Sequence, residues 1–276
     1  MITTKQQLPN VTLLMIESNP GHHQLAKLAV EDCLAVADFG DILIMADQFN
    51  ELRFPGARYI SINGGDKIDG YCRPLWYFVP QLVKTEQVLI IQYDSWICHA
   101  DLWQDKFLDY DYIGAPWLMD NKHNMIAYGG PILEGTNFVV GNSGFSFRSK
   151  KLIDYIAANK ETMPLIDSCE DFLLSITYNK QLREAGFKWA DGETALQFSA
   201  ETVRTFRSDD KYPGGYMSWG FHGVSAWPYV LEKDRLIERA KLFAKNDYVR
   251  RVKYMSGKTM LESLVAEAPY LTYFVN

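Results

Sequence analysis

The sequence lacks a long apolar run, closely spaced cysteines and an excess of positive charge. No apolar stretch approaches the ~20 residues that a membrane-spanning helix needs, and the opening MITTKQQLPN has no apolar core of a signal peptide. No C-x-x-C pair occurs, which favours free thiols in a reducing compartment over disulfides. The cysteines are Cys33, Cys72, Cys98 and Cys169. We therefore expect a cytoplasmic protein.

The net charge of −6 excludes the broad positive surface with which general nucleic-acid binders neutralise phosphates. We expect no nucleic-acid partner. The chain has 276 residues, 47% of them apolar, which is enough to bury one large core. One domain, with or without a small appendage, is the expected organisation.

Strand and helix patterns alternate in the first half of the chain. Short apolar runs of strand length lie at 11–17, 41–47, 58–63 and 88–93. Between them, helical periodicity follows Pro20, with Asn19 as its N-cap, and recurs over 71–83. This alternation predicts an α/β fold of the Rossmann-like kind, with a mostly parallel sheet flanked by helices.

Ligands of such sheets bind at the carboxyl ends of the strands. Polar residues cluster at these predicted ends, namely Glu17, Ser18, Asn19, Asp47, Asn63 and Asp94. Neither G-x-G-x-x-G nor a Walker-type loop follows the first strand, which disfavours a dinucleotide oxidoreductase and a P-loop kinase. We predict a ligand site of another kind at this edge.

The second half is less regular. It predicts strands at 110–117 and 139–148, a polar glycine-rich loop at about 118–138, helices at 149–159 and 169–185, and a polar stretch at 191–201. The basic segment 231–254 predicts a helix whose cations either face solvent or attach loosely to an anionic membrane leaflet.

We assign 1–230 to the α/β domain and 231–276 to a helical extension packed on it.

Asp94 directly follows a buried strand and has two interpretations. Its carboxylate suits a divalent cation that bridges a diphosphate, or it caps the turn into Ser95. The glycine-rich segment 140–149 also has two interpretations. Asn142 and Gly144 there suit a ligand that approaches the backbone, while a β-bulge with Ser149 capping the next helix explains the same residues.

Ser168–Asp171 matches the capping-box pattern, and the residues alone favour that interpretation over a catalytic carboxylate. Among the histidines, His22 and His23 begin a helix and are expected to be exposed. His222, between glycines and aromatics, is better placed to bind a metal or a phosphate. No H-E-x-x-H or G-x-S-x-G motif supports a metalloprotease or a serine hydrolase.

Several segments match a known pattern in order. They are Gln92–Ser95, Tyr110–Trp117 (YDYIGAPW), Gly141–Ser149 (GNSGFSFRS), Glu170-Asp171 and Phe221–Gly223, with Tyr71 and Arg73 before the fourth strand. This pattern resembles a glycosyltransferase-like family, long labelled a domain of unknown function, over about residues 10–228. The order of motifs is also similar to that of GT-A transferases of the fringe and β-galactosyltransferase types.

The resemblance implies roles for individual residues. Asp94 stands for the last acid of a metal-binding D-x-D motif, His222 for a late histidine that completes metal or diphosphate binding, and Glu170-Asp171 for the acidic pair that binds acceptor and supplies the base. Gln92 departs from the family pattern, because it stands where the first acid of D-x-D is expected.

The resemblance therefore implies an inverting glycosyltransferase that uses a UDP-hexose and Mn²⁺ or Mg²⁺. A glycan or lipid-linked glycan of cell-surface polysaccharide or O-antigen synthesis is the expected acceptor. The expected donor contacts are Glu17, Ser18, Asn19, Asp47, Arg73 and Asp94, and the expected acceptor contacts are Trp117, Asn142, Gly144 and Trp219. Two rival functions stay open at this point, a non-catalytic sugar- or nucleotide-binding protein and a nucleotidyltransferase.

Overall fold

The computed structural model describes residues 5–65, 67–118, 138–166, 168–201 and 218–244. The predicted loop at 118–138 lies almost wholly outside the described residues, as does the second half of the basic segment 231–254.

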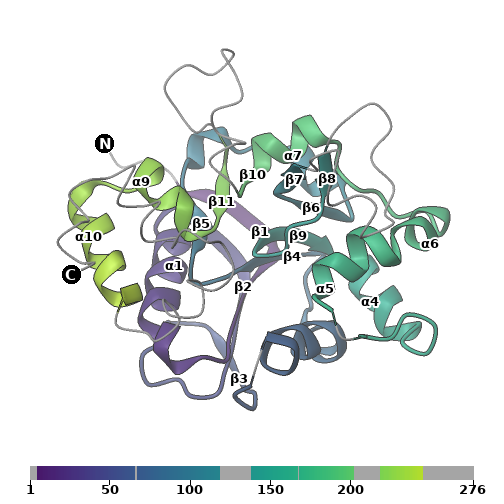
Figure 1. The fold of residues 1–276 in the computed structure, drawn as a ribbon, viewed down its shortest axis with the longest axis horizontal. Helices are drawn as coiled ribbons and strands as arrows, with labels where there is room; N and C mark the ends of the chain where they lie inside the picture. Colours follow the sequence, from purple (N-terminus) through teal and green to yellow (C-terminus); the bar gives the residue numbers. More distant parts are fainter. Residues whose placement is uncertain (1–4, 66, 119–137, 167, 202–217, 245–276) are drawn as a thin grey trace, which may run out of the picture.

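A six-stranded sheet in the order β3-β2-β1-β4-β9-β6 forms the centre of the molecule (Figure 1). The first four strands in this order are parallel, and β9 is antiparallel to both of its neighbours. The strands are β1 (Gln6–Glu17), β2 (Ala37–Ala46), β3 (Arg58–Ser61), β4 (Gln87–Ile91), β6 (Tyr112–Gly114) and β9 (Phe145–Ser149). The predicted mixed, mostly parallel α/β sheet is confirmed.

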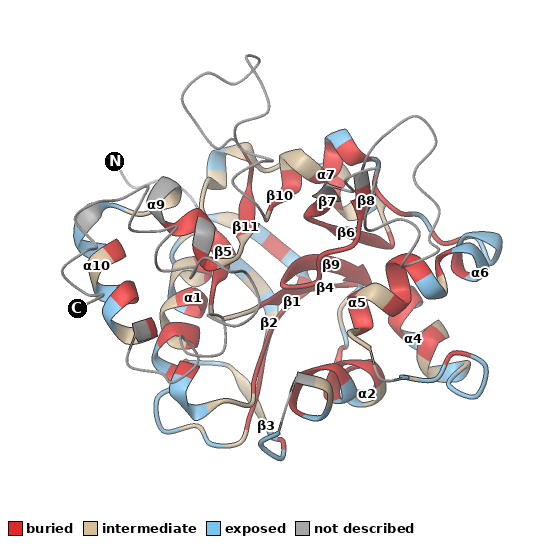
Figure 2. Ribbon diagram, in the orientation of Figure 1, coloured by how far each residue is buried: buried red, intermediate tan, exposed pale blue. Residues whose placement is uncertain are grey.

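Helices cover both faces of this sheet because the strand residues alternate between two apolar layers. Leu13 and Met15 of β1 pack in the cluster that contains the buried face of α1 (His23–Val36). Leu14 and Ile16 point to the opposite layer. That layer is covered by the continuous helical segment η2 (Lys67–Cys72), η3 (Pro74–Phe78) and α2 (Val79–Leu82), and by α4 (Lys150–Ala158). Figure 2 shows the buried residues gathered in the central strands and on the helix faces turned toward them.

Element boundaries differ from the predictions mainly where glycines and turns interrupt strands. The predicted strand at 110–117 is divided at Ala115 into β6 and β7 (Pro116–Leu118), and the one at 139–148 into β8 (Phe138–Val140) and β9. The predicted helix at 169–185 consists of α5 (Glu170–Phe172), η6 (Leu173–Thr177) and α6 (Asn179–Glu184). The stretch 191–201 contains an unpredicted helix, α7 (Gly192–Phe198), capped by Asp191. The remaining short elements are η1 (Pro20–His22), η4 (Ala100–Leu102), η5 (Asp105–Asp109), η7 (Val224–Ala226) and α9 (Trp227–Val230).

Two predicted caps are confirmed and one is wrong. Asn19 Oδ1 accepts a hydrogen bond from the backbone of Gly21, and Ser149 Oγ accepts one from Leu152. The capping box at Ser168–Asp171 does not form, because Cys169 occupies the N-cap position of α5 without a side-chain capping bond.

A small three-stranded sheet joins distant parts of the sequence above the central one. It has the order β10-β11-β5, with β5 (Ser95–Ile97), β10 (Ser199–Ala200) and β11 (Gly220–His222). Its register places His222 opposite Ser95. It therefore brings the segments around residues 94, 201 and 222 together.

The helix α10 (Lys233–Ala244) packs against α1. Arg235 and Arg239 both form ion pairs with Asp32 of α1. Arg239 also lies 4.0 Å from the ring centroid of Trp96 and is buried, which lowers the pKa of its guanidinium to about 10. The prediction that the cations of this helix face solvent or a membrane is therefore wrong for Arg239, whereas Arg235 is exposed. No helix within the described ranges is both long and apolar enough to cross a membrane.

Replacement of Asp32 should weaken the docking of α10. We expect Asp32→Ala to lower the free energy of unfolding by about 3 kcal/mol, because it leaves the buried Arg239 cation without its partner. Urea unfolding followed by circular dichroism measures this. The neighbouring exposed acid Glu31, which pairs with Lys27, is the matched control, and Glu31→Ala should change the value by less than about 0.5 kcal/mol. Equal effects of the two substitutions would contradict the docking role.

Candidate functional site

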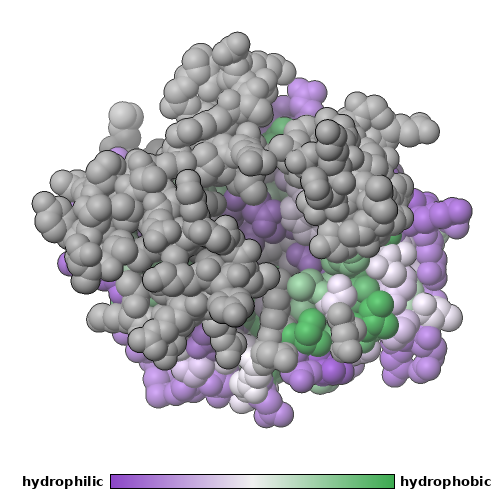
Figure 3. Space-filling view, viewed as in Figure 1, coloured by the Kyte–Doolittle hydropathy of each residue, from purple (hydrophilic) through white to green (hydrophobic). Residues whose placement is uncertain are grey.

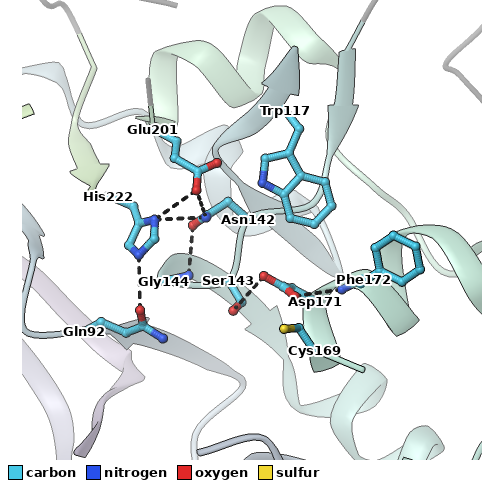
Figure 4. Close-up of a pocket in the computed structure, with 10 residues that line it drawn as sticks. All are labelled: Gln92, Trp117, Asn142, Ser143, Gly144, Cys169, Asp171, Phe172, Glu201 and His222. Carbon is cyan, nitrogen blue, oxygen red and sulfur yellow. Dashed lines mark hydrogen bonds and ion pairs between the residues drawn. The ribbon is translucent and has the colours of Figure 1, made fainter. Parts of the chain in front are cut away.

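A pocket of about 280 Å³ opens at the carboxyl edge of the central sheet. The face in Figure 3 is hollowed near its centre, where hydrophilic side chains gather. The pocket is lined by Gln92, Trp117, Asn142, Ser143, Gly144, Cys169, Asp171, Phe172, Glu201 and His222 (Figure 4). It therefore collects residues from six separate stretches of the chain, and most of the predicted motifs contribute to it.

The turn that follows β4 forms one side of the site. Ser95 closes this turn, because its hydroxyl accepts from the backbone of Gln92 and donates to the carbonyl of Gly144 at 2.5 Å. Asp94, in the turn, is buried, and its Oδ1 makes no hydrogen bond to a described residue. Burial raises the pKa of the Asp94 carboxyl, and His222 opposes that shift. A buried carboxylate of this kind is suited to a cationic partner.

His222 faces this turn through one ring nitrogen. Its Nε2 lies 3.1 Å from Gln92 Oε1 and 3.6 Å from Asp94 Oδ1. The ring lies against the backbone of Gly144, where an added Cβ would come within 2.1 Å of His222 Cδ2. The glycine at 144 is therefore required for the position of the imidazole.

Asn142 holds the opposite side of that imidazole. Its Oδ1 accepts from the backbone of Gly144 at 2.9 Å. The Nδ2 atom is then free to donate, and it lies 2.8 Å from Glu201 Oε1 and 2.9 Å from His222 Nδ1. The GNSGF segment thus serves both as a turn between strands and as part of the pocket wall.

Asp171 lies across the pocket from His222 (Figure 4). Its Oδ1 accepts from the backbone of Phe172 at 2.8 Å, and its Oδ2 lies 3.4 Å from Ser143 Oγ. Trp117 borders the pocket on the same side, where its ring covers Gly141. Asp171 therefore lies beside the rings of Trp117 and Phe172. This arrangement suits a sugar, because the carboxylate can accept a hydrogen bond from a hydroxyl group while an aromatic ring packs against the sugar ring.

Glu170 does not reach the pocket, so its predicted role as a base is wrong. Its carboxylate is 1% exposed and accepts a 2.7 Å hydrogen bond from the equally buried Arg148. Burial would lower the pKa of Arg148, but Glu170 outweighs it and raises that pKa. Glu170 therefore balances a buried charge.

The predicted donor contacts lie at the ends of β1 and β2. Glu17 Oε1 accepts from the backbone of Asn19, and Asp47 Oδ1 lies 3.2 Å from His23 Nε2. Ser18 packs against Gly70, where an added Cβ would meet its hydroxyl at 2.1 Å. These residues form a polar edge next to the turn that carries Asp94.

Arg73 is exposed and pairs with Asp69 at 2.8 Å. It is absent from the lining of the pocket. Its predicted contact with a diphosphate therefore stays a prediction.

Two further expectations are corrected by burial. His22 and His23 are buried, because they pair with Glu17 and Asp47 at the strand ends, and His22 stacks on Tyr93 at 4.1 Å. Trp219 is fully buried among Trp103, Phe145, Phe147 and Phe198. It has no free face on which an acceptor sugar could stack, so that prediction is wrong.

Sequence reasoning missed Glu201, Cys169 and Phe172 as pocket residues. Cys169 and Phe172 flank the Glu-Asp pair and could have been included by proximity. Nothing in the polar stretch 191–201 singles out Glu201, because only the pairing of β10 with β11 brings it beside His222.

The donor atoms fit a small divalent cation. Among the described residues, no three His, Cys, Asp or Glu side chains are arranged to hold a metal ion. The amide oxygen of Gln92 supplies a third donor beside Asp94 Oδ1 and His222 Nε2. Separations of 3.1 and 3.6 Å suit adjacent ligands of one ion, which lie about 3 Å apart when each is about 2.1 Å from the metal.

One solved structure with a TM-score above 0.5 agrees with this architecture. The structure is similar to that of the galactosyltransferase LgtC in complex with donor and acceptor sugar analogues, with a TM-score of 0.51 and 12% identity over 83% of this chain and 94% of that chain. An active-site mutant of LgtC gives 0.47 and 11%, over 77% and 86%. A 4-diphosphocytidyl-2C-methyl-D-erythritol synthase from Anaerococcus prevotii gives 0.37 and 10%, over 67% and 85%.

No curated protein matches the chain. The model of one family, described as "Protein of unknown function (DUF5672)", matches residues 75–217, just over half of the sequence. That range includes most of the pocket residues. The chain therefore belongs to the DUF5672 family, on a mixed α/β fold similar to that of the GT-A glycosyltransferase LgtC.

Proposed function

We propose that this protein transfers a sugar from a nucleotide-sugar donor to a hydroxyl group of a glycan or lipid-linked glycan. One observation carries the proposal. His222 and Asp171 face each other across a single pocket at the carboxyl edge of the sheet, and Asp94 lies beside the pocket, 3.6 Å from His222 Nε2. We assign the binding of a cation and the diphosphate to Asp94 with His222, and the binding of the acceptor to Asp171. The fold, similar to that of a galactosyltransferase, supports it.

The donor enters from the polar edge formed by Glu17, Ser18, Asn19 and Asp47, which bind the nucleoside. This edge adjoins Asp94, because β1 pairs with both β2 and β4. The diphosphate then lies at Asp94 and His222, and the sugar extends into the pocket over Asn142 and Gly144. A UDP-hexose is the donor that we propose.

Asp94, His222 and Gln92 would hold Mn²⁺ or Mg²⁺, which offsets the negative charge of the diphosphate when bound. The described lining of the pocket contains Asp171 and Glu201 but no lysine or arginine. A diphosphate would meet repulsion there unless a cation accompanied it. This charge balance supports a cation at Asp94.

Asp171 acts as the general base. Its carboxylate accepts the proton of the acceptor hydroxyl as that oxygen bonds to the anomeric carbon of the donor. The bond from the anomeric carbon to the diphosphate oxygen breaks at the same time, and the electron pair leaves with the diphosphate. Attack from the side of Asp171, opposite the diphosphate, inverts the anomeric centre.

A thermal-shift panel tests the proposal. Wild-type protein is mixed with UDP-, GDP-, CDP- and ADP-sugars, with and without Mn²⁺, because a bound ligand raises the apparent stability. The best donor is then incubated without acceptor, and slow release of free sugar identifies a transferase. Binding without any hydrolysis would favour a non-catalytic sugar-binding protein, and absence of all binding would remove the proposal.

Gln92 should limit the affinity for a cation in the absence of nucleotide. We expect Gln92→Asp to bind Mn²⁺ alone about tenfold more tightly, because it adds a second carboxylate beside Asp94. Titration of free Mn²⁺ by electron paramagnetic resonance measures this, with Gln181→Asp on the exposed surface of α6 as the control. Equal affinity of the wild type and Gln92→Asp would show that residue 92 does not face the ion.

The assignment of 231–276 to a separate extension, the attachment to a membrane and the role in cell-surface polysaccharide synthesis stay predictions. The pocket itself lies in 92–222, so the proposed reaction does not depend on them.

A further inference from the structure

Glu201 is a second carboxylate in the pocket, and no motif of the sequence assigns it a role. It follows β10 directly and lies next to β11. Its Oε1 is 2.8 Å from Asn142 Nδ2 and 3.3 Å from His222 Nδ1. Figure 4 shows Glu201 and Gln92 on opposite sides of the imidazole.

We propose that Glu201 is a positioning residue that, with Asn142, holds the His222 imidazole so that Nε2 faces Gln92 and Asp94. The role in donor binding rests on the proposed function. The position of the ring does not, because it follows from contacts within the protein.

Hydrogen-bond direction determines which nitrogen of His222 carries the proton. Asn142 Oδ1 accepts from the backbone of Gly144, so its Nδ2 is the atom that donates to His222 Nδ1. Nδ1 is then an acceptor, and in the absence of a cation the proton of a neutral imidazole lies on Nε2, which faces Gln92 Oε1. A cation bound at Nε2 would require this proton to move to Nδ1, where Glu201 Oε1, 3.3 Å away, can accept it.

Glu201 stabilises this arrangement by holding the amide of Asn142. The same amide nitrogen serves both Glu201 and His222, so loss of the carboxylate frees the amide to turn. A partner of this kind orients a functional histidine, and its loss commonly reduces binding or activity 10- to 100-fold.

A double-mutant cycle tests the proposal. It measures the affinity for UDP in the presence of Mn²⁺, or for GDP, CDP or ADP where the wild type binds one of these best. Glu201→Ala, which removes the acceptor of Asn142 Nδ2, should weaken binding about tenfold in the wild type, but less than about twofold in the His222→Gln background, because the effect passes through His222. Glu193→Ala, on the exposed side of α7, is the matched control and should have no effect.

A spectroscopic measurement separates positioning from a general loss of structure. Spectra of ¹⁵N-histidine-labelled protein without added cation should show the His222 proton on Nε2 in the wild type and a mixture of tautomers in Glu201→Ala. The His222 signal is the one that disappears in His222→Gln. A proton on Nδ1 in the cation-free wild type, or equal losses of affinity in both backgrounds, would overturn the proposal. No nucleotide binding by the wild type would instead remove the proposed function and leave the tautomer result standing.

Discussion

Asp171→Asn should reduce the rate of sugar transfer by about 10²- to 10⁴-fold, the range typical of a lost general base. The substitution keeps the shape of the side chain. Its amide oxygen can still accept from the backbone of Phe172, as the carboxylate does at 2.8 Å. Only the ability to take the acceptor proton is lost, so affinity for the donor should change less than about twofold. Initial rates with the donor found in the panel, together with calorimetric titration of that donor, measure both quantities.

The control for this experiment is Asp154→Asn, which neutralises an exposed acid of α4 that pairs with Lys150. It should transfer sugar at the wild-type rate. Turnover by Asp171→Asn at the wild-type rate would remove the base assignment. A loss of donor affinity as large as the loss of rate would also contradict it, because Asp171 would then be a donor-binding residue.

Glu170→Gln should lower the free energy of unfolding by about 3–5 kcal/mol, because it leaves the buried Arg148 guanidinium without a counter-charge. Both side chains of this pair are almost fully buried. The neighbouring rings do not replace the lost charge, although Arg148 also lies 5.3 Å from the ring centroid of Tyr112. Chemical denaturation with urea measures the loss. The adjacent acids Glu170 and Asp171 are thus expected to differ, one acting on stability and the other on catalysis.

Glu184→Gln is the matched control, since it removes an exposed acid that pairs with Lys180 at 3.9 Å. Its effect should stay below about 0.5 kcal/mol. Glu170→Gln combined with Arg148→Met should be more stable than Glu170→Gln alone, because no buried charge then remains. A fully stable Glu170→Gln protein that loses transfer would contradict this account and restore Glu170 as a catalytic residue.

Periodicity was enough to predict that strands β1 to β4 follow one another along the chain. The signal is clearest for β1, β2 and β4, because each contains a nearly continuous apolar run that is buried on both faces of the sheet. Irregular segments were harder. The helix α7 escaped prediction because its buried residues are few and interspersed with polar ones, and its capping residue, Asp191, was the one local signal. Asp191 and Thr194 illustrate a cap that was present in the sequence but was not used.

For the site, motifs predicted Asp94, Asn142, Gly144, Asp171 and His222, and all five lie in the pocket or, for Asp94, beside it. They could not separate Glu170 from Asp171, because adjacent residues at a helix start point in different directions and only packing shows which one meets Arg148. The sequence also placed Trp219 at the acceptor, although packing against other aromatic rings buries it in the core.

The sequence by itself determined the alternating α/β layout and the polar residues at the strand ends, because both follow from local periodicity and strand length. Only the tertiary structure decided which polar residues share a pocket. The pairing of β11 with β5 places His222 beside Asp94, and that of β10 with β11 adds Glu201. The first pairing joins residues more than a hundred positions apart, and the second joins residues 21 positions apart across a segment with no regular pattern. No local pattern encodes either contact, because their stability comes from packing that forms only in the folded chain.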